Sequence, residues 1–218
     1  MQAIILVVVL ILSVVVHEVA HAWQARREGD DTADRLGRIT LNPIPHIDPI
    51  GSIILPGILA WQGGIIFGWA KPVPVNPLNY REYVAGDIRV SMAGIVSNLI
   101  LAALATLAAG ILVKMTSIIG PLGGASDLLF LSLNYTIFIN LILANFNLIP
   151  IPPLDGSHVL AHVLPVQLAD RYRQLSQFGL FIVMGLVFLP IGRDLFEFLL
   201  WPTFFLQGLA DQFIRLWI

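Results

Sequence analysis

Long apolar stretches alternate with short polar ones along this chain. The apolar segments run over residues 3–25, 88–113, 128–148 and 175–189, and a last stretch at 195–218 could either span or lie at the interface. A helix needs about 20 mostly apolar residues to cross the hydrocarbon core of a bilayer. The pattern therefore predicts an all-α polytopic membrane protein with about four to six transmembrane helices.

One apolar stretch does not have the features of a regular helix. Residues 52–69 contain Pro56 and several glycines, and the following Lys71-Pro-Val-Pro-Val-Asn-Pro77 alternates valine with proline. Irregular backbone is tolerated at membrane depth only where it is buried in protein or faces water. Prolines also restrict a strand to the edge of a sheet. We therefore expect a re-entrant or β-hairpin element near residues 52–77.

The chain is expected to form one membrane-embedded domain over residues 1–218, with its C-terminal helices at 175–218. No linker separates two parts, and the first apolar segment lacks the basic region and cleavage site of a signal peptide, so we expect it to be retained.

Composition excludes several classes of protein. Hydrophobic residues make up 57% of the chain and charged ones only 12%, against about 25% charged residues in a soluble domain. The net charge of −2, without a basic cluster, argues against a nucleic-acid partner. The absence of cysteine excludes disulfides, thiolate metal sites and a cysteine nucleophile.

The first apolar segment contains the sequence His17-Glu18-Val19-Ala20-His21. Residues four apart lie on one face of a helix, so both imidazoles can bind one cation, and the neighbouring glutamate can act as general base. A chance match or a polar packing patch is the alternative. Three unpartnered ionisable groups within a membrane helix would be costly, however, so the setting favours a metal site.

Two histidines do not complete a catalytic zinc site, which usually has three protein ligands and an open position for water. Without cysteine, the third ligand must be His, Asp or Glu. Asp155 follows a long apolar segment and a proline-rich turn, and Gly156 permits a close turn there. Asp155 is equally suited to cap a short helix that begins at Ser157, and the two roles are compatible.

The two motifs together resemble the site-2 protease family of intramembrane zinc metalloproteases. Residues 147–156 fit the family pattern N-x-x-P-x-P-x-L-D-G at every fixed position, and Gly94-x-x-x-Asn98 resembles a motif on the family's middle core helix. The resemblance covers about residues 5–165, the expected catalytic core, without PDZ or CBS domains. It implies one Zn²⁺ per chain with the following roles: His17, His21 and Asp155 as ligands, Glu18 as catalytic base, and Asn147 as a polar residue near the cleavage site.

Three further residues, His46, His158 and Asn98, are weaker candidates. His46 could be a fourth ligand, an oxyanion donor or structural, and we favour a structural or supporting role because water needs an open position. His158 lies three residues after Asp155 and so faces near it, whereas His162 is expected on a helix surface. Asn98 is expected to make hydrogen bonds between helices, with a substrate-facing role as the weaker alternative.

The resemblance also implies a reaction and a location. The expected activity is hydrolysis of peptide bonds within or next to the transmembrane segments of a membrane-protein substrate, with that substrate and the lipid bilayer as partners. Most Arg and Lys residues fall on the cytoplasmic side if the loop after the first segment is cytoplasmic. We then expect a multi-pass protein of the cell (inner) membrane whose active site opens toward the cytoplasm. A membrane metal transporter and a catalytically inactive homologue that binds membrane partners are the rival interpretations.

Overall fold

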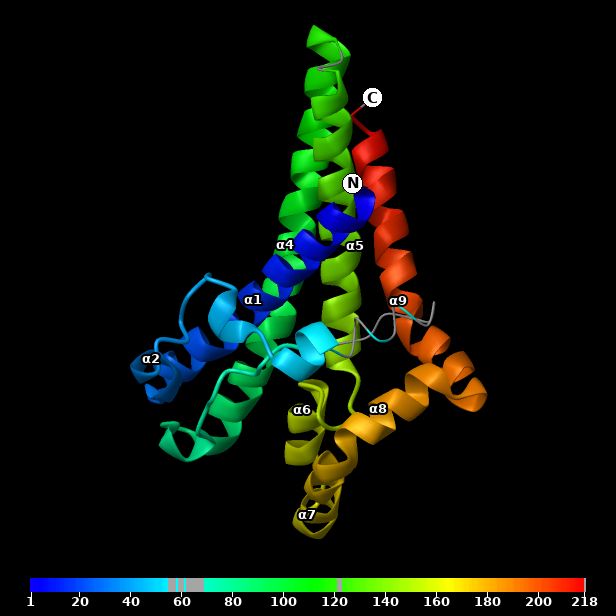
Figure 1. Ribbon diagram of the computed structural model, residues 1–218. Coiled ribbons are helices and arrows are strands. Elements are labelled where there is room, and N and C mark those ends of the chain that lie inside the picture. The colour runs from blue at the N-terminus through cyan, green and yellow to red at the C-terminus, as the bar shows by residue number, and fades with distance from the viewer. Residues whose placement is uncertain (55–57, 59–60, 62–68, 121–122, 218) are drawn as a thin grey trace.

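Three long helices form the frame of the protein. The computed structural model describes residues 1–54, 58, 61, 69–120 and 123–217. Within them, three helices are long and apolar enough to cross a membrane: α1 (Gln2–Glu28), α4 (Tyr83–Ile119) and α5 (Gly124–Leu148). In Figure 1, α4 and α5 run antiparallel and α1 crosses them obliquely. The predicted all-α, membrane-compatible fold is confirmed.

Short helices connect and extend this frame. Between α1 and α4 lie α2 (Thr32–Arg35), the 3₁₀-helices η1 (Ile44–His46) and η3 (Pro77–Asn79), and the π-helix η2 (Pro49–Ile54). After α5 the chain continues through α6 (Gly156–Val163), α7 (Val166–Gln174), the 3₁₀-helix η4 (Leu175–Phe178), α8 (Gly179–Phe188) and α9 (Pro190–Arg215).

The expected hairpin near residues 52–77 falls partly on residues that the structure does not describe. Its beginning belongs to the π-helix η2, and residues 70–76 are extended but belong to no strand. Residues 55–57, 59–60 and 62–68 lie outside the described part of the chain.

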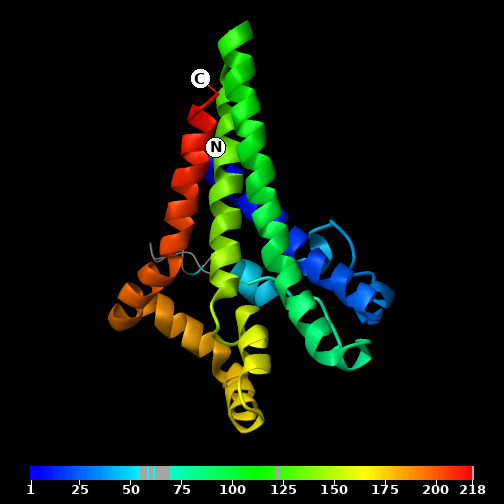
Figure 2. The same cartoon turned by 180° about the vertical axis from the view of Figure 1, so that it is seen from behind.

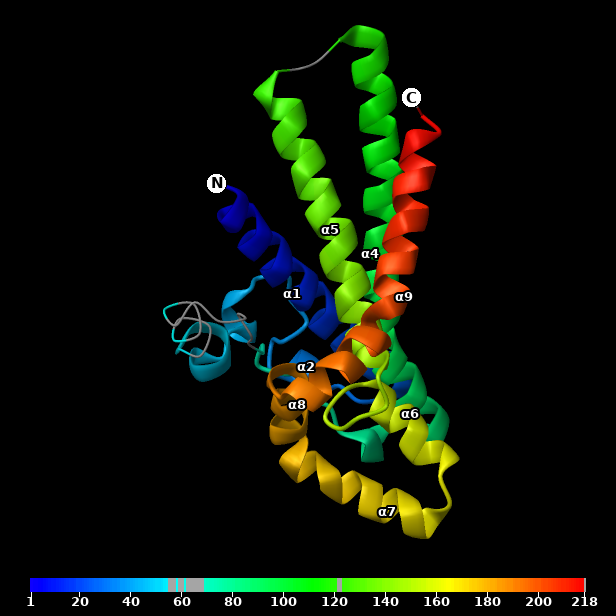
Figure 3. The same cartoon turned by 90° about the vertical axis from the view of Figure 1, so that its right-hand side faces the viewer.

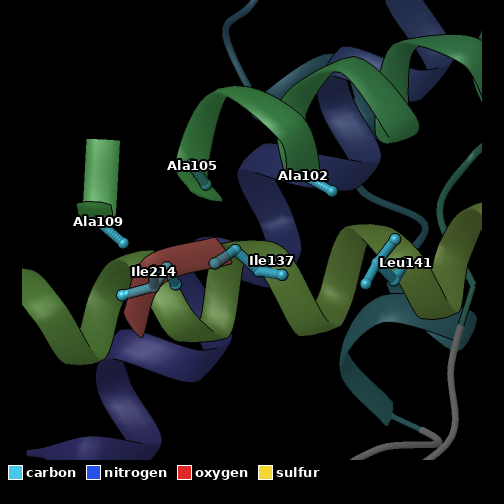
Figure 4. Packing of buried hydrophobic residues seen from close by; sticks show 6 residues of the cluster. All are labelled: Ala102, Ala105, Ala109, Ile137, Leu141 and Ile214. Atoms are coloured by element: carbon cyan, nitrogen blue, oxygen red, sulfur yellow. The ribbon is translucent and has the colours of Figure 1, made fainter. Parts of the chain in front are cut away.

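The largest apolar cluster lies where α4, α5 and α9 meet. Figure 4 shows its six buried residues, which are Ala102, Ala105 and Ala109 of α4, Ile137 and Leu141 of α5, and Ile214 of α9. Without a hydrophobic driving force in lipid, helices associate through close packing, and alanines allow the backbones to approach. The C-terminal stretch whose position the sequence left open thus packs along α4 and α5 as part of α9 (Figure 3).

A hydrogen bond adds a polar contact to this packing. The Nδ2 group of Asn145 in α5 donates to Oγ1 of Thr203 in α9 over 2.8 Å, and Thr203 is completely buried. This contact lies one residue after Pro202, which lies inside α9.

Helix α1 ends in a network of polar contacts that fixes its C-terminal end. Gly29 has a φ of 116°, a left-handed conformation that favours glycine and stops the helix. Arg89 of α4 donates two hydrogen bonds to the Glu28 carboxylate, at 2.8 and 2.7 Å. The buried Asp30 accepts hydrogen bonds from the backbone N–H of Asn76 and the side chain of Asn79.

The ends of several elements meet at one end of the bundle. Figures 1 and 2 show the end of α1, the start of α4, the end of α5, and α6 together in the lower half of the molecule. Two long helices, α4 and α5, lie between α1 and α6 in the sequence, so the chain returns to the same end. This topology brings the two sequence motifs together.

Candidate metal centre

His17, His21 and Asp155 form a compact cluster of potential metal ligands. The Nε2 atoms of the two histidines are 3.0 Å apart, and Oδ2 of Asp155 lies 3.2 Å from one and 3.3 Å from the other. Both histidines are buried, with 6% and 8% of their surfaces exposed. Among the described residues, these three make up the one group of at least three His, Cys, Asp or Glu side chains whose ligand atoms converge closely enough for a single ion.

The second ring nitrogen of each histidine is fixed by a hydrogen bond to helix α4. His17 Nδ1 lies 2.5 Å from Oδ1 of Asn98, and His21 Nδ1 lies 2.7 Å from the carbonyl oxygen of Val90. Both acceptors are carbonyl-type oxygens when the Asn98 amide is oriented in this way, so Nδ1 carries the proton in the neutral form of each ring. The Nε2 lone pairs then point into the cluster, which is how a metal-binding histidine is usually oriented.

The Asn98 side chain is itself held by a buried chain of hydrogen bonds. Its Nδ2 group donates to Oδ1 of Asn140 over 2.7 Å, and Asn140 Nδ2 donates to Oγ of Ser13 over 2.9 Å. Asn98 and Asn140 are both completely buried. These hydrogen bonds link α4, α5 and α1 around the cluster, so three helices fix the orientation of the His17 imidazole.

Two glycines allow the elements to approach this closely. A Cβ atom added at Gly94 would lie 2.4 Å from Nε2 of His21 and 2.5 Å from Cε1 of His17. A Cβ atom added at Gly156 would lie 2.2 Å from the carbonyl oxygen of Leu148. Neither distance is sterically allowed, so both positions require glycine for the observed packing.

Asp155 occupies the N-cap position of α6 but does not cap it. Its side chain makes no capping hydrogen bond within the described residues, and its Oδ2 oxygen faces the two histidines instead. Burial would raise the pKa of Asp155, but interactions with His17 and His21 outweigh burial and hold this pKa well below its usual range. Asp155 is therefore an ionised carboxylate at neutral pH, the form that binds metals.

The donor set fits a tetrahedral zinc ion. Zinc ligands lie about 2.0–2.1 Å from the ion, which places neighbouring ligand atoms about 3.3–3.4 Å apart. The three observed separations of 3.0, 3.2 and 3.3 Å are close to this value. Moreover, Asp155 Oδ2 is a buried oxygen that accepts no hydrogen bond of ordinary geometry from any described residue. A cation bound by the three ligand atoms would satisfy this oxygen.

Glu18 is held beside the cluster by the extended segment 70–76. Its Oε2 oxygen accepts a hydrogen bond of 2.8 Å from the backbone N–H of Val73. Glu18 is the sequence neighbour of His17 and lies partly exposed. This contact connects the carboxylate of the first motif to the segment in which valines and prolines alternate.

Comparison with known proteins agrees with this geometry. Residues 49–189 match the family model of peptidase family M50. YwhC of Bacillus subtilis (strain 168), provisionally named a zinc metalloprotease, is 37% identical over 212 residues, which cover 97% of this chain and 90% of YwhC. The chain belongs to peptidase family M50, the site-2 protease family.

A second M50 relative extends the comparison to another organism. Rip2 of Mycolicibacterium smegmatis, also provisionally named a zinc metalloprotease, is 30% identical over 218 residues, which cover 95% of this chain and 78% of Rip2. No solved structure matches the chain. The match to the M50 family model begins after the first motif, whereas the two relatives are similar over nearly the whole chain, including the region of α1.

Three further candidate site residues, His46, Asn147 and His158, lie outside the metal cluster. His46 is buried, and its Nε2 lies 3.0 Å from the carbonyl oxygen of Thr40, which favours a structural role in the loop. Asn147 donates from Nδ2 to the carbonyl oxygen of Leu143 in its own helix. His158 is half exposed, and its Nδ1 lies 3.4 Å from Oδ2 of Asp87.

Two buried polar contacts near the site were not expected from the sequence. The placement of His162 on a helix surface was wrong, because only 5% of its side chain is exposed and its Nε2 lies 2.7 Å from Oδ2 of Asp87. The link from Ser13 and Asn140 through Asn98 to His17 was not predicted. The available signal was the occurrence of a polar side chain in an apolar segment, which indicates buried hydrogen bonding without naming the partner.

Proposed function

We propose that this chain is an intramembrane zinc metalloprotease that hydrolyses peptide bonds within or next to transmembrane segments of membrane proteins. The observation that carries the proposal is the triangle formed by His17, His21 and Asp155, whose three facing atoms are 3.0–3.3 Å apart. Membership of family M50 and the apolar helices around the cluster support it.

In this proposal one Zn²⁺ is held by Nε2 of His17, Nε2 of His21 and Oδ2 of Asp155. The chemistry that zinc supplies when bound is Lewis acidity, which activates water and polarises a carbonyl group near neutral pH. A tetrahedral ion with three protein ligands leaves one position for water or substrate.

Glu18 is assigned the proton transfers. Its Oε2 is bonded to the N–H of Val73, so the second oxygen, Oε1, is the atom that takes a proton from the attacking water. The same oxygen then delivers the proton to the amine of the leaving peptide, as a general acid. The Val73 contact holds the carboxylate in one orientation, which keeps Oε1 directed for both transfers.

The extended segment 70–76 has few free groups for pairing with a substrate. The N–H groups of Lys71, Val73 and Asn76 already donate to His46, Glu18 and Asp30, and the prolines have none. Strand addition by a substrate, which this edge-like sequence favours, would therefore rely mainly on the N–H of Val75 and on backbone carbonyls other than those of Lys71 and Pro72, which already accept from Arg38.

The charge distribution supports a cytoplasmic opening of the site. The last turn of α1, with Arg26 and Arg27, and the segment after it, with Arg35 and Arg38, lie at the same end of the bundle as α7, which carries Arg171 and Arg173 (Figure 1). Positively charged loops remain on the cytoplasmic side of bacterial membranes. We therefore propose a multi-pass protein of the cell membrane whose metal centre is reached from the cytoplasmic side.

A metal transporter is the less favoured function. Transport requires several sites along a path, and the part of the chain that the structure describes contains a single convergent group of metal ligands. A catalytically inactive homologue would not need the fixed carboxylate of Glu18.

The decisive experiment compares two variants of the purified full-length chain. Glu18→Gln should keep stoichiometric zinc and lose cleavage of a single-span model membrane substrate, and undiminished cleavage would contradict the role of Glu18. Asp155→Ala should lose zinc at the same free-metal concentration. Full zinc occupancy in that variant would show that Asp155 is not a ligand.

A further inference from the structure

One face of helix α4 contacts both histidines of the proposed zinc site and also helix α6, which follows the third proposed ligand, Asp155. The four residues involved are spaced by three, four and four positions, so they lie along one side of the helix, and all of them are buried: Asp87, Val90, Gly94 and Asn98. Asn98 and Val90 orient the two histidines, and Gly94 lets the histidine rings pack against the helix. The fourth residue of the row, Asp87, does not touch the cluster.

Asp87 contacts helix α6, whose N-cap residue is Asp155. Its Oδ2 oxygen lies 2.7 Å from Nε2 of His162 and 3.4 Å from Nδ1 of His158. Only 10% of the Asp87 side chain and 5% of the His162 side chain are exposed. The ring of Tyr83 packs edge-on against His162, with ring centroids 5.7 Å apart. The Asp87–His162 contact is therefore buried and supported from a second side.

The position of Asp155 depends on how α6 is held. The Asp155 side chain forms no capping bond to α6, so no local contact within that helix fixes it. Contacts near both of its ends help to hold helix α6. Gly156 packs against the carbonyl of Leu148 at its start, and His162 binds Asp87 near its end. His162 lies seven positions after Asp155, which is about 10 Å along the helix axis. A tilt of α6 at one end therefore moves its other end.

We propose that Asp87 is a positioning residue for the third zinc ligand: by binding His162 it sets the tilt of α6 and thereby places Oδ2 of Asp155 against His17 and His21. This inference rests on the proposed function. It assigns a role to a buried carboxylate that touches neither zinc nor substrate, and it makes α4 the element that aligns all three ligands.

The test measures zinc affinity of the purified full-length chain by competition with a chelator. Asp87→Ala should weaken zinc binding about 10–100-fold, the usual effect of removing a residue that orients a metal ligand. Asp87→Asn, which keeps an acceptor oxygen, should restore part of this loss. His162→Ala should reproduce the Asp87→Ala effect. The double variant should be no more than about threefold weaker than either single variant, because both changes remove the same contact.

Glu82→Ala is the matched control. Glu82 is also a carboxylate at the start of α4, but its side chain is 70% exposed and its contact is a 3.4 Å ion pair with Arg89. An exposed pair of this kind contributes little, so zinc affinity should stay within about twofold of wild type.

The thermal unfolding midpoint of the metal-free protein separates positioning from simple stabilisation. If Asp87→Ala and His162→Ala lower this midpoint but keep wild-type zinc affinity, Asp87 is only structural and the inference is wrong. His162→Ala and Asp87→Asn test the same contact if Asp87→Ala fails to fold. A wild-type chain that takes up no zinc would refute the proposed function as well. Zinc binding that depends on Asp155 but not on Asp87 would refute this inference alone.

Discussion

The imidazole of His17 and the side-chain amide of Asn98 form a hydrogen bond of 2.5 Å between residues 81 positions apart. The bond joins α1 to α4 in the buried centre of the bundle. In the neutral imidazole this bond places the proton on Nδ1 and leaves the Nε2 lone pair facing Asp155. A residue that binds no metal therefore decides whether His17 is able to bind one.

Asn98→Leu should lower zinc affinity about 10–100-fold, because His17 loses the acceptor that fixes its tautomer and ring orientation. Chelator competition on the purified protein measures this loss. Asn134→Leu is a suitable control, since Asn134 is a partly exposed asparagine of α5 whose side chain bonds to its own helix, at Phe130. Equal zinc affinities in the Asn98 and Asn134 variants would disprove the orienting role.

Gly94→Ala should disrupt the metal centre by steric overlap. The new methyl group would lie 2.4 Å from Nε2 of His21, so the imidazoles must move or α1 must separate from α4. Overpacking of this kind typically costs about 1–3 kcal/mol. We expect a lower thermal unfolding midpoint together with loss of zinc.

Gly208→Ala tests whether that effect depends on position. A Cβ atom at Gly208 of α9 meets nothing within 4 Å in the described structure. Replacing glycine by alanine within a helix should then stabilise the protein by up to about 1 kcal/mol. A similar loss of zinc in both variants would indicate general damage to the bundle and not a local clash at the histidines.

The long helices and the two motifs of the proposed metal site could be predicted because each depends on local sequence. His17 and His21 are four residues apart, and Asp155 stands directly after a proline-rich turn, so their shared position required only an even number of crossings between them. The partners of Asn98 could not be predicted. Helix α4 is apolar on all sides, and its sequence does not reveal which face turns toward α1 and α5.

The wrong prediction for His162 has a similar origin. Its burial depends on the packing of α6 against α4, and the sequence of α6 alone does not specify which of its faces meets Asp87. The structure of the extended segment 70–76 was also only partly predicted. Its alternating valines and prolines suggested an edge strand, but residues 70–76 form no strand, and its hydrogen bonds to Glu18 and Asp30 join residues far apart in the sequence.

Asp30 should make stability depend on pH. Burial alone would raise the pKa of Asp30, but hydrogen bonds from Thr32, Asn76 and Asn79 outweigh burial and lower it. A folded-state pKa below the unfolded value of about 3.9 gives stability that is present above this value and is lost as the pH falls through the folded-state pKa. The thermal unfolding midpoint should therefore fall between pH 7 and about pH 3, and Asp30→Asn should reduce this fall.

Asp31→Asn is the control for the pH experiment. Asp31 is the next residue, but its side chain is 48% exposed and is paired with Arg35 at the surface. Its removal should leave the pH dependence almost unchanged, because exposed ion pairs contribute little. An identical pH profile for wild type and Asp30→Asn would rule out a contribution from the Asp30 network.

Val73→Pro should reduce the rate of the chemical step without removing zinc. The substitution deletes the N–H group that holds Oε2 of Glu18, while the three proposed zinc ligands remain in place. A misplaced general base typically costs about 10²–10⁴-fold in rate, and we expect a loss toward the lower end because the carboxylate is still present. Steady-state cleavage of a single-span model substrate should show a lower kcat with zinc occupancy unchanged.

Val75→Pro places the same ring two residues later, at an N–H with no hydrogen bond among the described residues. If substrates pair with this segment, Val75→Pro should raise KM and spare kcat, whereas Val73→Pro should lower kcat. A lower kcat in both variants would instead mean that the shape of the segment, and not the bond from Val73 to Glu18, controls the base.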